Sequence, residues 1–332
     1  MLRLKSPGHD RFFQSPTLEA TFGGAELNVA TSLSNLGLNA AYVTALPENE
    51  VAEAVIGELK RFGVDTDFIK RQGERLGTYY LEAGASLRPS RVIYDRAHSS
   101  LCEANKGDFN WREIFEGAAW FHTTGITPAI SQSAADLTLD AMETAQEMGL
   151  TVSLDLNYRG KLWKYGKDVT DVMPELVKHA DIMIAGREDC QKCLGVDVDV
   201  PTIEDISSLD HFGALSEKML DVYPNLNIVA ITLRQSISSD YHRWSSCLRD
   251  NDGFYSTDIF EVNNIVDRVG AGDGFAAGLI YGLNNYDNNK KALDFAVCAS
   301  ALKHSIPGDT NRITVDEVTS LMNGTSIGRV QR

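Results

Sequence analysis

The residues best suited to chemistry stand late in the chain, in the run Gly-Ala-Gly-Asp from Gly270 to Asp273. Phe275 and Leu279 follow at helical spacing, so the run is expected to open a helix. Two glycines let the backbone turn tightly and leave its N–H groups uncovered, and the helix start adds partial positive charge. These donors would cradle an anion while the Asp273 carboxylate takes a proton from a hydroxyl. Transfer of a phosphoryl group to an alcohol requires such a pair.

Two further segments have residue types that suit a ligand site. Gly23 and Gly24 precede a second expected helix, which carries Asn28. The two glycines could simply cap this helix. Alternatively, they could let a small ligand come close to the backbone, where Asn28 would bind its hydroxyls. Asn157 and Arg159 follow an expected strand, and the carboxyl ends of strands are where open α/β sheets bind ligands. An arginine there could grip a carboxylate or phosphate, or could be ordinary surface charge.

Other chemistries fit the sequence poorly. The dinucleotide fingerprint Gly-x-Gly-x-x-Gly fails because Phe275 stands where its last glycine would be, and the chain has no Walker-type phosphate loop. Cys190 and Cys193 form a lone Cys-x-x-Cys without a second ligand pair, so a structural role is expected. The seven histidines show no ligand or triad spacing.

The composition indicates a soluble globular protein. The chain has 332 residues, of which 43% are hydrophobic and 23% charged. Its net charge of −15 argues against a nucleic-acid partner. No apolar run reaches the roughly 18 residues of a membrane span, and no signal peptide is recognisable. Five cysteines fit a reducing cytoplasm better than a disulfide scaffold. We therefore expect a cytoplasmic protein that binds neither nucleic acid nor membrane.

The elements that must position these residues alternate along the chain. The hydrophobic pattern predicts strands at 40–46, 120–122, 151–156, 181–185 and 228–233. Helices are predicted between or after them at 27–36, 51–62, 131–148, 205–222 and 290–306. Such alternation indicates a parallel sheet covered by helices on both faces. Two regions, 4–22 and 77–96, read instead as antiparallel ribbon, which would form a lid on the α/β body.

Together these motifs resemble the ribokinase-like (PfkB) carbohydrate kinase family. The residues that carry the resemblance are Gly23-Gly24-Ala25-x-x-Asn28 and the segment 267–273, Asp-Arg-Val-Gly-Ala-Gly-Asp. The resemblance implies a single kinase domain over residues 1–332, built as a three-layer αβα sandwich with a mostly parallel central sheet. A small β-ribbon lid would come from about 4–24 and 76–97.

Within the family the chain is most similar to kinases of 2-keto-3-deoxygluconate, on the segments 77–80, 91–96, 125–129, 155–159 and 306–309. The resemblance implies phosphorylation of a sugar acid by ATP and Mg²⁺, with 2-keto-3-deoxygluconate converted to its 6-phosphate. A kinase of a neutral sugar, as in ribokinase or fructokinase, is one alternative. A sugar-binding relative with weak catalysis is another. The exposed edges of the lid favour a homodimer, or a higher homo-oligomer, formed through it.

The resemblance also implies a role for each matching residue. Asp273 would be the catalytic base, and the N–H groups of Gly270, Ala271 and Gly272 would form the anion hole. The sugar acid would be held by Gly24, Ala25, Asn28, Tyr80, Tyr94, Arg96, Arg159, Asp273 and Asp309, with Tyr79 competing with Tyr80 for its position. The nucleotide would contact Asn157, Arg159, Thr232, Arg234, Ser236, Ser239, Gly270 and Gly272. Magnesium would be placed by Glu188 and Asp189, through water.

Three features depart from the family pattern. The strand that members usually carry before the segment 1–4 is missing or cut short, which predicts the loss of a central strand. Gly186 stands where members have the asparagine of Asn-x-x-Glu, so metal placement must rest on the carboxylates that follow it, or on water. Arg268 stands where threonine is frequent, and Ser236 and Ser239 where glycine is, which predicts an altered nucleotide contact.

Overall fold

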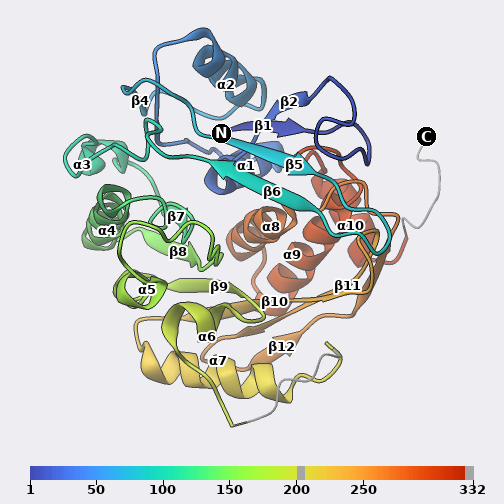
Figure 1. Cartoon of the computed structure of the whole chain (residues 1–332). Helices are drawn as coiled ribbons and strands as arrows, with labels where there is room; N and C mark the ends of the chain where they lie inside the picture. Colours follow the sequence, from blue (N-terminus) through green and yellow to red (C-terminus); the bar gives the residue numbers. More distant parts are fainter. Residues whose placement is uncertain (200–205, 326–332) are drawn as a thin grey trace.

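A sheet of mixed direction forms the centre of the molecule. The computed structural model describes residues 1–199 and 206–325 (Figure 1). The strand order is β12-β11-β10-β9-β8-β7, with β13 paired to β11. Strands β7 to β10 run parallel, and the pairs that involve β11 are antiparallel. The bounds are β7 Trp120–Thr124, β8 Thr151–Asp155, β9 Ile182–Gly186, β10 Ile228–Ser236, β11 Tyr241–Arg249, β12 Phe254–Ser256 and β13 Phe260–Asn263.

Helices cover both faces of this sheet, as the alternating pattern predicts. Along β9, Ile182 and Ile184 join the apolar cluster with α1, α8 and α9, while Met183 and Ala185 join the cluster with α3 to α7. This alternation follows from the two-residue repeat of a strand. The first group is α1 Ala25–Asn35, α8 Ala271–Asn285 and α9 Asn289–Lys303. The second is α3 Trp111–Ile114, α4 Gln132–Glu147, α5 Val169–Val177, α6 Asp189–Leu194 and α7 Asp210–Val222.

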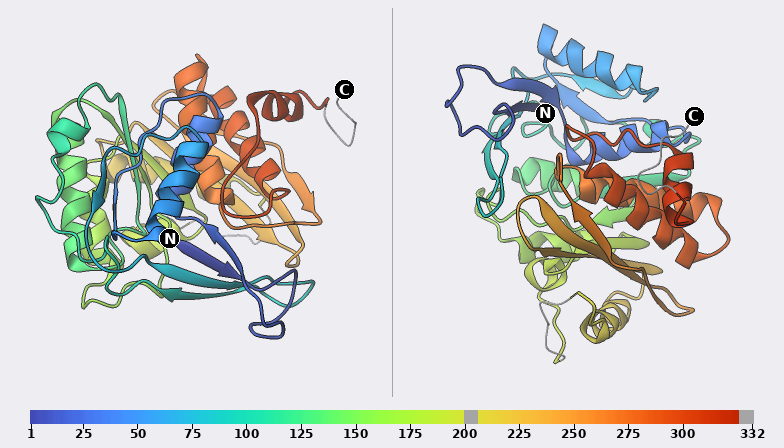
Figure 2. Two further views of the ribbon diagram at one scale, coloured as in Figure 1. Left: turned by 90° about the horizontal axis from the view of Figure 1, so that it is seen from above. Right: turned by 90° about the vertical axis from the view of Figure 1, so that its right-hand side faces the viewer.

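The two regions predicted as antiparallel ribbon combine into one small sheet. Its order is β2-β1-β5-β6, with β1 Leu2–Lys5, β2 Glu19–Phe22, β5 Thr78–Glu82 and β6 Arg91–Asp95. The prediction missed one pairing, because β1 runs parallel to β5 and so joins the two ribbons. Figures 1 and 2 show the small sheet on one side of α8 and α9, with the central sheet on the other.

The central sheet ends at β7, and a groove follows that edge. The segment 1–5 belongs to the small sheet, as part of β1. The strand predicted over 40–46 is confined to β3, Thr44–Leu46, which pairs with β4, Ile69–Arg71, in a separate two-stranded sheet. A cavity of about 670 Å³ lies between β7 and the segment 38–44.

The remaining helices are α2, Glu50–Arg61, and α10, Val315–Met322. The helix predicted over 205–222 is α7, and residue 205 lies outside the described residues. Helices α8 and α9 pack closely because Gly278 and Gly282 carry no side chain. A Cβ at these positions would lie 2.8 Å from the Cα of Ala296 and 2.6 Å from the Cα of Ala292. Among the described residues, no helix is both long enough and apolar enough to cross a bilayer.

Candidate active site

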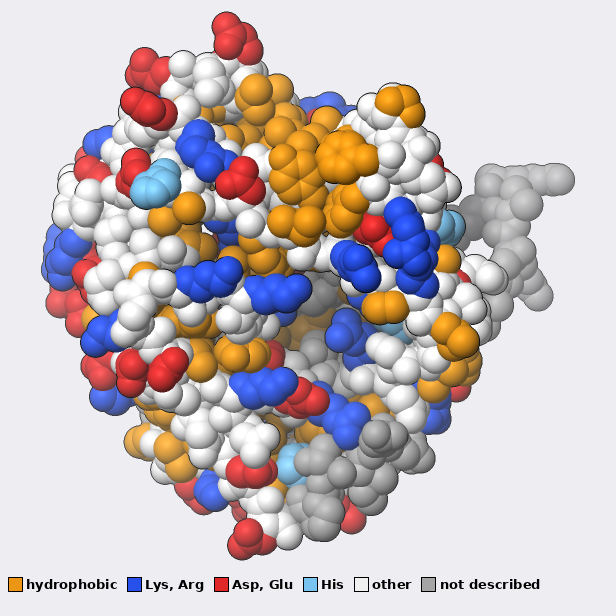
Figure 3. Space-filling model, viewed as in Figure 1, with side chains coloured by type: hydrophobic (Ala, Val, Ile, Leu, Met, Phe, Trp, Pro, Cys, Tyr) orange, Lys and Arg blue, Asp and Glu red, His pale blue; other side chains and the backbone are white. Residues whose placement is uncertain are grey.

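A cavity of about 570 Å³ lies where the carboxyl ends of β8 and β9, the small sheet and the starts of α1 and α8 meet. Figure 3 shows a hollow near the centre of this face, with Lys and Arg side chains around it. Most residues predicted from the sequence line this cavity, namely Gly24, Ala25, Asn28, Tyr94, Arg96, Asn157, Arg159, Glu188, Asp189, Thr232, Arg234, Gly270, Ala271, Gly272, Asp273 and Asp309. Tyr80, Ser236 and Ser239 are not among its lining residues.

The start of α8 forms an anion-binding turn. Gly270 has a φ of 84°, and a Cβ there would lie 2.0 Å from the backbone oxygen of Asp309, so only glycine fits. The first helical hydrogen bond runs from the Gly274 N–H to the Gly270 oxygen at 2.8 Å. The N–H groups of residues 271–273 therefore have no partner within the helix. Ala271 donates to the Arg268 oxygen only at 3.4 Å.

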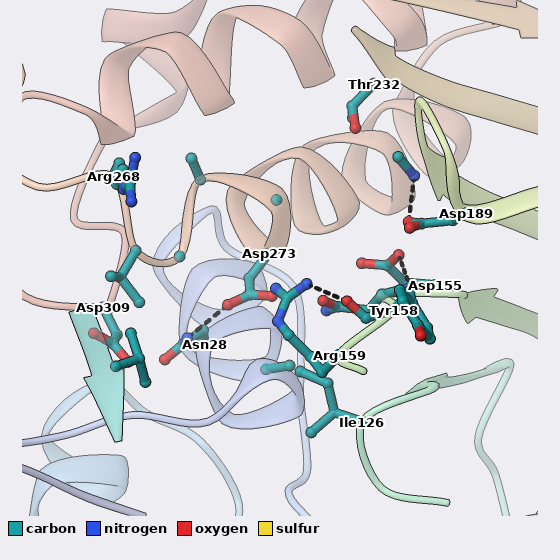
Figure 4. A pocket seen from close by; sticks show the side chains of 18 of the residues that line it. Asn28, Ile126, Asp155, Tyr158, Arg159, Asp189, Thr232, Arg268, Asp273 and Asp309 are labelled. Atoms are coloured by element: carbon teal, nitrogen blue, oxygen red, sulfur yellow. Dashed lines mark hydrogen bonds between the residues drawn. The ribbon is translucent and has the colours of Figure 1, made fainter. Parts of the chain in front are cut away.

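Asp273 extends into the cavity from the first turn of α8 (Figure 4). Its carboxylate accepts a hydrogen bond of 2.6 Å from the Asn28 side-chain amide, which α1 supplies because α1 and α8 pack together. Burial raises the pKa of Asp273 to about 7, although the Asn28 hydrogen bond and Arg159 act in the opposite direction. The group can thus hold or release a proton near neutral pH, as a general base must.

Asp309 holds the small sheet against the anion-binding turn. Arg3 of β1 forms buried ion pairs with Asp309 and Asp267, and the Tyr79 hydroxyl donates to Asp309 at 2.5 Å. The backbone at Gly23 also lies close to Asp309, since a Cβ at Gly23 would lie 2.0 Å from the Asp309 carboxylate. Asp309 therefore already has strong partners at the end of the cavity beneath the small sheet.

The structure corrects the choice between the two tyrosines of β5. Successive side chains of a strand point to opposite sides. Tyr79 is 4% exposed and lines the cavity, whereas Tyr80 lies on the other face and is partly exposed. Tyr94 and Arg96 line the same end of the cavity, and the Arg96 guanidinium lies 5.9 Å from the centre of the Tyr94 ring.

Two carboxyl groups lie close together at or just beyond the ends of β8 and β9. Asp189 accepts the Gly186 N–H at 2.7 Å, and burial raises its pKa. Sequence reasoning missed Asp155, at the end of β8, whose pKa is raised well above its ordinary value by burial and by the nearby Asp189 and Asp273. Glu188 instead pairs with Lys192. Within the described ranges, no group of three or more His, Cys, Asp or Glu residues could hold a metal ion.

Three arginines line the side of the cavity formed by the central sheet and the 267–270 segment. They are Arg159, Arg234 and Arg268, and within residues 1–199 and 206–325 none of them forms a salt bridge. Desolvation and the nearby Arg268 and Arg159 lower the pKa of Arg234 from its ordinary value. Arginines crowded in this way attract an anion with several charges. Arg268 was noticed in the sequence only as a departure from the family pattern.

The structure also corrects the prediction that Ser236 and Ser239 contact the nucleotide. Ser236 is the last residue of β10 and is exposed to solvent. The Ser239 hydroxyl donates to the Arg88 backbone oxygen of the small sheet at 2.6 Å. Neither side chain extends into the cavity, since the hairpin of β10 and β11 reaches beyond it.

Glu26 is a further residue that the sequence did not reveal. It stands in the first turn of α1, and its carboxylate accepts hydrogen bonds from the Thr124 N–H at 3.2 Å and the Thr124 hydroxyl at 2.9 Å. The Thr127 hydroxyl donates to the same oxygen at 2.7 Å. Glu26 thereby fixes the start of α1 against the end of β7.

An anion-binding helix start beside a buried carboxylate, at the strand ends of a three-layer α/β fold, defines a carbohydrate kinase of ribokinase-like architecture. A model of the pfkB family of carbohydrate kinases matches residues 5–314. The chain therefore belongs to the pfkB family, and the family and fold predicted from its motifs are confirmed.

Relatives that are named for their activities align with nearly the whole chain. A 2-dehydro-3-deoxygalactonokinase of Haloferax volcanii is 32% identical over 328 residues, which are 99% of this chain and 96% of the relative. A 2-dehydro-3-deoxygluconokinase of Bacillus subtilis is 26% identical, over 91% of this chain and 86% of the relative. The crystal structure of the 2-dehydro-3-deoxygluconokinase of Thermotoga maritima is 44% identical, with a TM-score of 0.91 and coverage of 98% of this chain and 97% of that one.

The raised pKa of Asp273 predicts a stability effect of Asp273→Asn. The pKa of about 7 in the folded protein lies above the ordinary 3.8, so the stability that protonated Asp273 contributes is present at low pH and lost as pH rises through 7. At pH 8 the variant should therefore be more stable than the wild type, by up to about 4 kcal/mol. The difference should disappear near pH 4. Urea unfolding at both pH values measures it.

The same substitution at Asp252, which is exposed, is the control and should change stability little at either pH. A wild type that is as stable as Asp273→Asn at pH 8 would contradict the burial of an ionisable carboxyl at this position.

Proposed function

We propose that this protein transfers the γ-phosphoryl group of ATP to a 2-keto-3-deoxy sugar acid, with 2-keto-3-deoxygluconate converted to its 6-phosphate. The observation that carries the proposal is the Asp273 carboxylate, buried in the cavity beside the N–H groups of the first turn of α8. The relatives from Haloferax volcanii and Bacillus subtilis act, by their names, on two such acids. With these reactants, the protein would work in the cytoplasm.

Asp273 and the turn at the start of α8 would have separate roles in phosphoryl transfer. The ionised carboxylate takes the proton of the attacking primary hydroxyl as its oxygen reaches phosphorus. The N–H groups at the start of α8 compensate the charge on the transferring phosphoryl oxygens. The pKa of about 7 keeps a fraction of Asp273 ionised near neutral pH in the free protein. Arg159, whose guanidinium lies next to Asp273 in Figure 4, favours that ionised form.

The sugar acid would occupy the end of the cavity beneath the small sheet. Arg96 lies there with its guanidinium 5.9 Å from the centre of the Tyr94 ring, and desolvation by burial lowers its pKa from the ordinary value. A buried cation of this kind suits the carboxylate of a sugar acid better than a neutral sugar. Asn28 and Tyr94 offer hydrogen bonds to hydroxyls in the same place.

The triphosphate would lie along the arginine side of the cavity. Arg234 and Arg268 would bind its charge, with Thr232 and Asn157 beside them. The donor set fits a magnesium ion carried in by the nucleotide, because Asp155 and Asp189 offer two carboxylates and water would complete the coordination. Bound there, magnesium would offset charge between the phosphates.

The small sheet would also be the surface of a homodimer. Its outer side and loops expose Phe13, Leu87 and Ile93, at 76%, 89% and 54% of their full accessible area. Pairing two such sheets would cover these side chains and the edge of β6. Sedimentation should give about twice the 36.5 kDa of one chain, and a mass of a single chain would contradict the dimer.

The proposal predicts that Asp273→Asn nearly abolishes turnover. A positioned base contributes roughly two to four orders of magnitude, so turnover should fall by about 10²- to 10⁴-fold while sugar affinity changes little. A coupled assay with ATP, magnesium and a panel of sugar acids and neutral sugars measures this. Near-normal turnover in the variant would overturn the assignment of the base. Thermal shifts with sugar acids but no turnover in the wild type would instead support a sugar-binding relative.

The sugar-acid class is tested by Arg96→Ala. Loss of a charged hydrogen bond costs about 1.5–3 kcal/mol, so the KM of the sugar acid should rise by roughly 10- to 100-fold. The KM of a neutral sugar should change little. Arg91→Ala is the matched control, because Arg91 is the exposed first residue of β6 and Arg96 directly follows that strand. Equal effects of Arg96→Ala on both substrate classes would favour the alternative, a kinase of a neutral sugar.

A further inference from the structure

Hydrogen bonds join the tip of the small sheet to a turn of the central sheet. The tip, residues 84–90, connects β5 to β6, and the turn, residues 237–240, connects β10 to β11. The Ser86 N–H donates to the Asp240 carboxylate at 2.6 Å, and the Ser239 N–H donates to the Ser86 oxygen at 2.8 Å. The Ser239 hydroxyl donates to the Arg88 oxygen at 2.6 Å. Two segments some 150 positions apart are thus bonded directly.

The fit between tip and turn is close. A Cβ at Gly84 would lie 2.5 Å from both the Arg88 oxygen and the Ser239 hydroxyl. Within the small sheet the tip is held by Arg88, which pairs with Glu82 and donates to the His9 oxygen. In Figure 1 the hairpin of β5 and β6 extends from the small sheet towards β11. The turn adds the hydrogen bonds that join the tip to the central sheet.

These hydrogen bonds connect the two sides of the cavity. The small sheet contributes Tyr79, Tyr94 and Arg96 to one side, and β10 contributes Thr232 and Arg234 to the other. When the tip is bonded to the turn, the small sheet is fixed over the end where the proposed function places the sugar.

The bonds are also of a kind that can open and re-form. They are polar and lie near the surface, and the side chains of Ser239 and Asp240 are partly exposed. Segments held by a few exposed hydrogen bonds open at low free-energy cost. The end of the small sheet opposite the tip is held more firmly, because Arg3 and Tyr79 bond it to buried carboxylates. Opening would therefore separate the tip from the turn and leave the opposite end in place.

We propose that Ser239 and Asp240 are positioning residues that latch the small sheet closed over the sugar. The inference rests on the proposed function for its substrate. A closed lid keeps water from the γ-phosphate and holds the sugar during transfer. With the latch removed, water can replace the sugar hydroxyl. Its oxygen then bonds to phosphorus while its proton passes to Asp273, the bond between phosphorus and the ADP oxygen breaks, and inorganic phosphate and ADP are released.

The test is the double variant Ser239→Ala with Asp240→Ala. The KM of the sugar acid should rise by about five- to ten-fold, as expected for the loss of hydrogen bonds worth about 1 kcal/mol. The KM of ATP should stay within about two-fold of the wild type, since Thr232 and Arg234 are untouched, whereas sugar-independent ATP hydrolysis should increase. A purely structural defect would instead lower both activities together. Ser239→Ala alone removes a single bond and should show a smaller effect in the same direction.

Amide hydrogen exchange of the unliganded protein gives a readout that needs no activity. In the double variant the Ser86 amide should exchange faster, while the Tyr79 amide at the opposite end of the small sheet should not change. Asp252→Ala, in the turn between β11 and β12, is the control and should leave Ser86 unaffected. Unchanged Ser86 exchange together with an unchanged sugar KM would overturn the latch. A wild type without kinase activity would refute the proposed function, and the exchange rate of Ser86 would still decide the latch.

Discussion

The geometry of the whole site depends on one buried ion cluster. Arg3 is 1% exposed and bonds both Asp267, just before the anion-binding turn, and Asp309, which packs under that turn. Removing one partner from a buried pair leaves an uncompensated charge, which is far more costly than losing a surface contact. Because Gly23 and Gly270 both lie against Asp309, the cluster also sets how closely the starts of α1 and α8 approach each other.

The close approach of these two helix starts positions the Asp273 carboxyl group. The starts of α1 and α8 bring Asn28 and Asp273 within a hydrogen bond, in a space from which most water is excluded. Burial of Asp273 costs stability at neutral pH, and the same burial gives the carboxyl a pKa near 7. The packing that weakens the fold locally is thus the packing that makes the group useful for proton transfer.

Local motifs could be predicted from the sequence, and pairings between distant segments could not. Glycine spacing indicates the turn before Asp273 because backbone freedom is a local property. The choice of Tyr79 over Tyr80 depends on which side of β5 faces the cavity, and that follows from its pairing with β1. Ser239 was assigned to the nucleotide by the family resemblance, and no local pattern shows that its partner is the Arg88 oxygen, about 150 positions away. Asp155 ends a strand in apolar surroundings, and only the fold shows that it stands beside Asp189.

The groove along β7 affects how the chain behaves before it is fully folded. Strand β7 ends the central sheet, and Glu26 covers the backbone only at Thr124, near the strand's carboxyl end. The rest of this edge borders a cavity of about 670 Å³ lined largely by apolar side chains. A sheet edge next to an apolar groove is a template on which a strand of another chain can add. This edge of the central sheet is therefore a place where partly folded chains can associate.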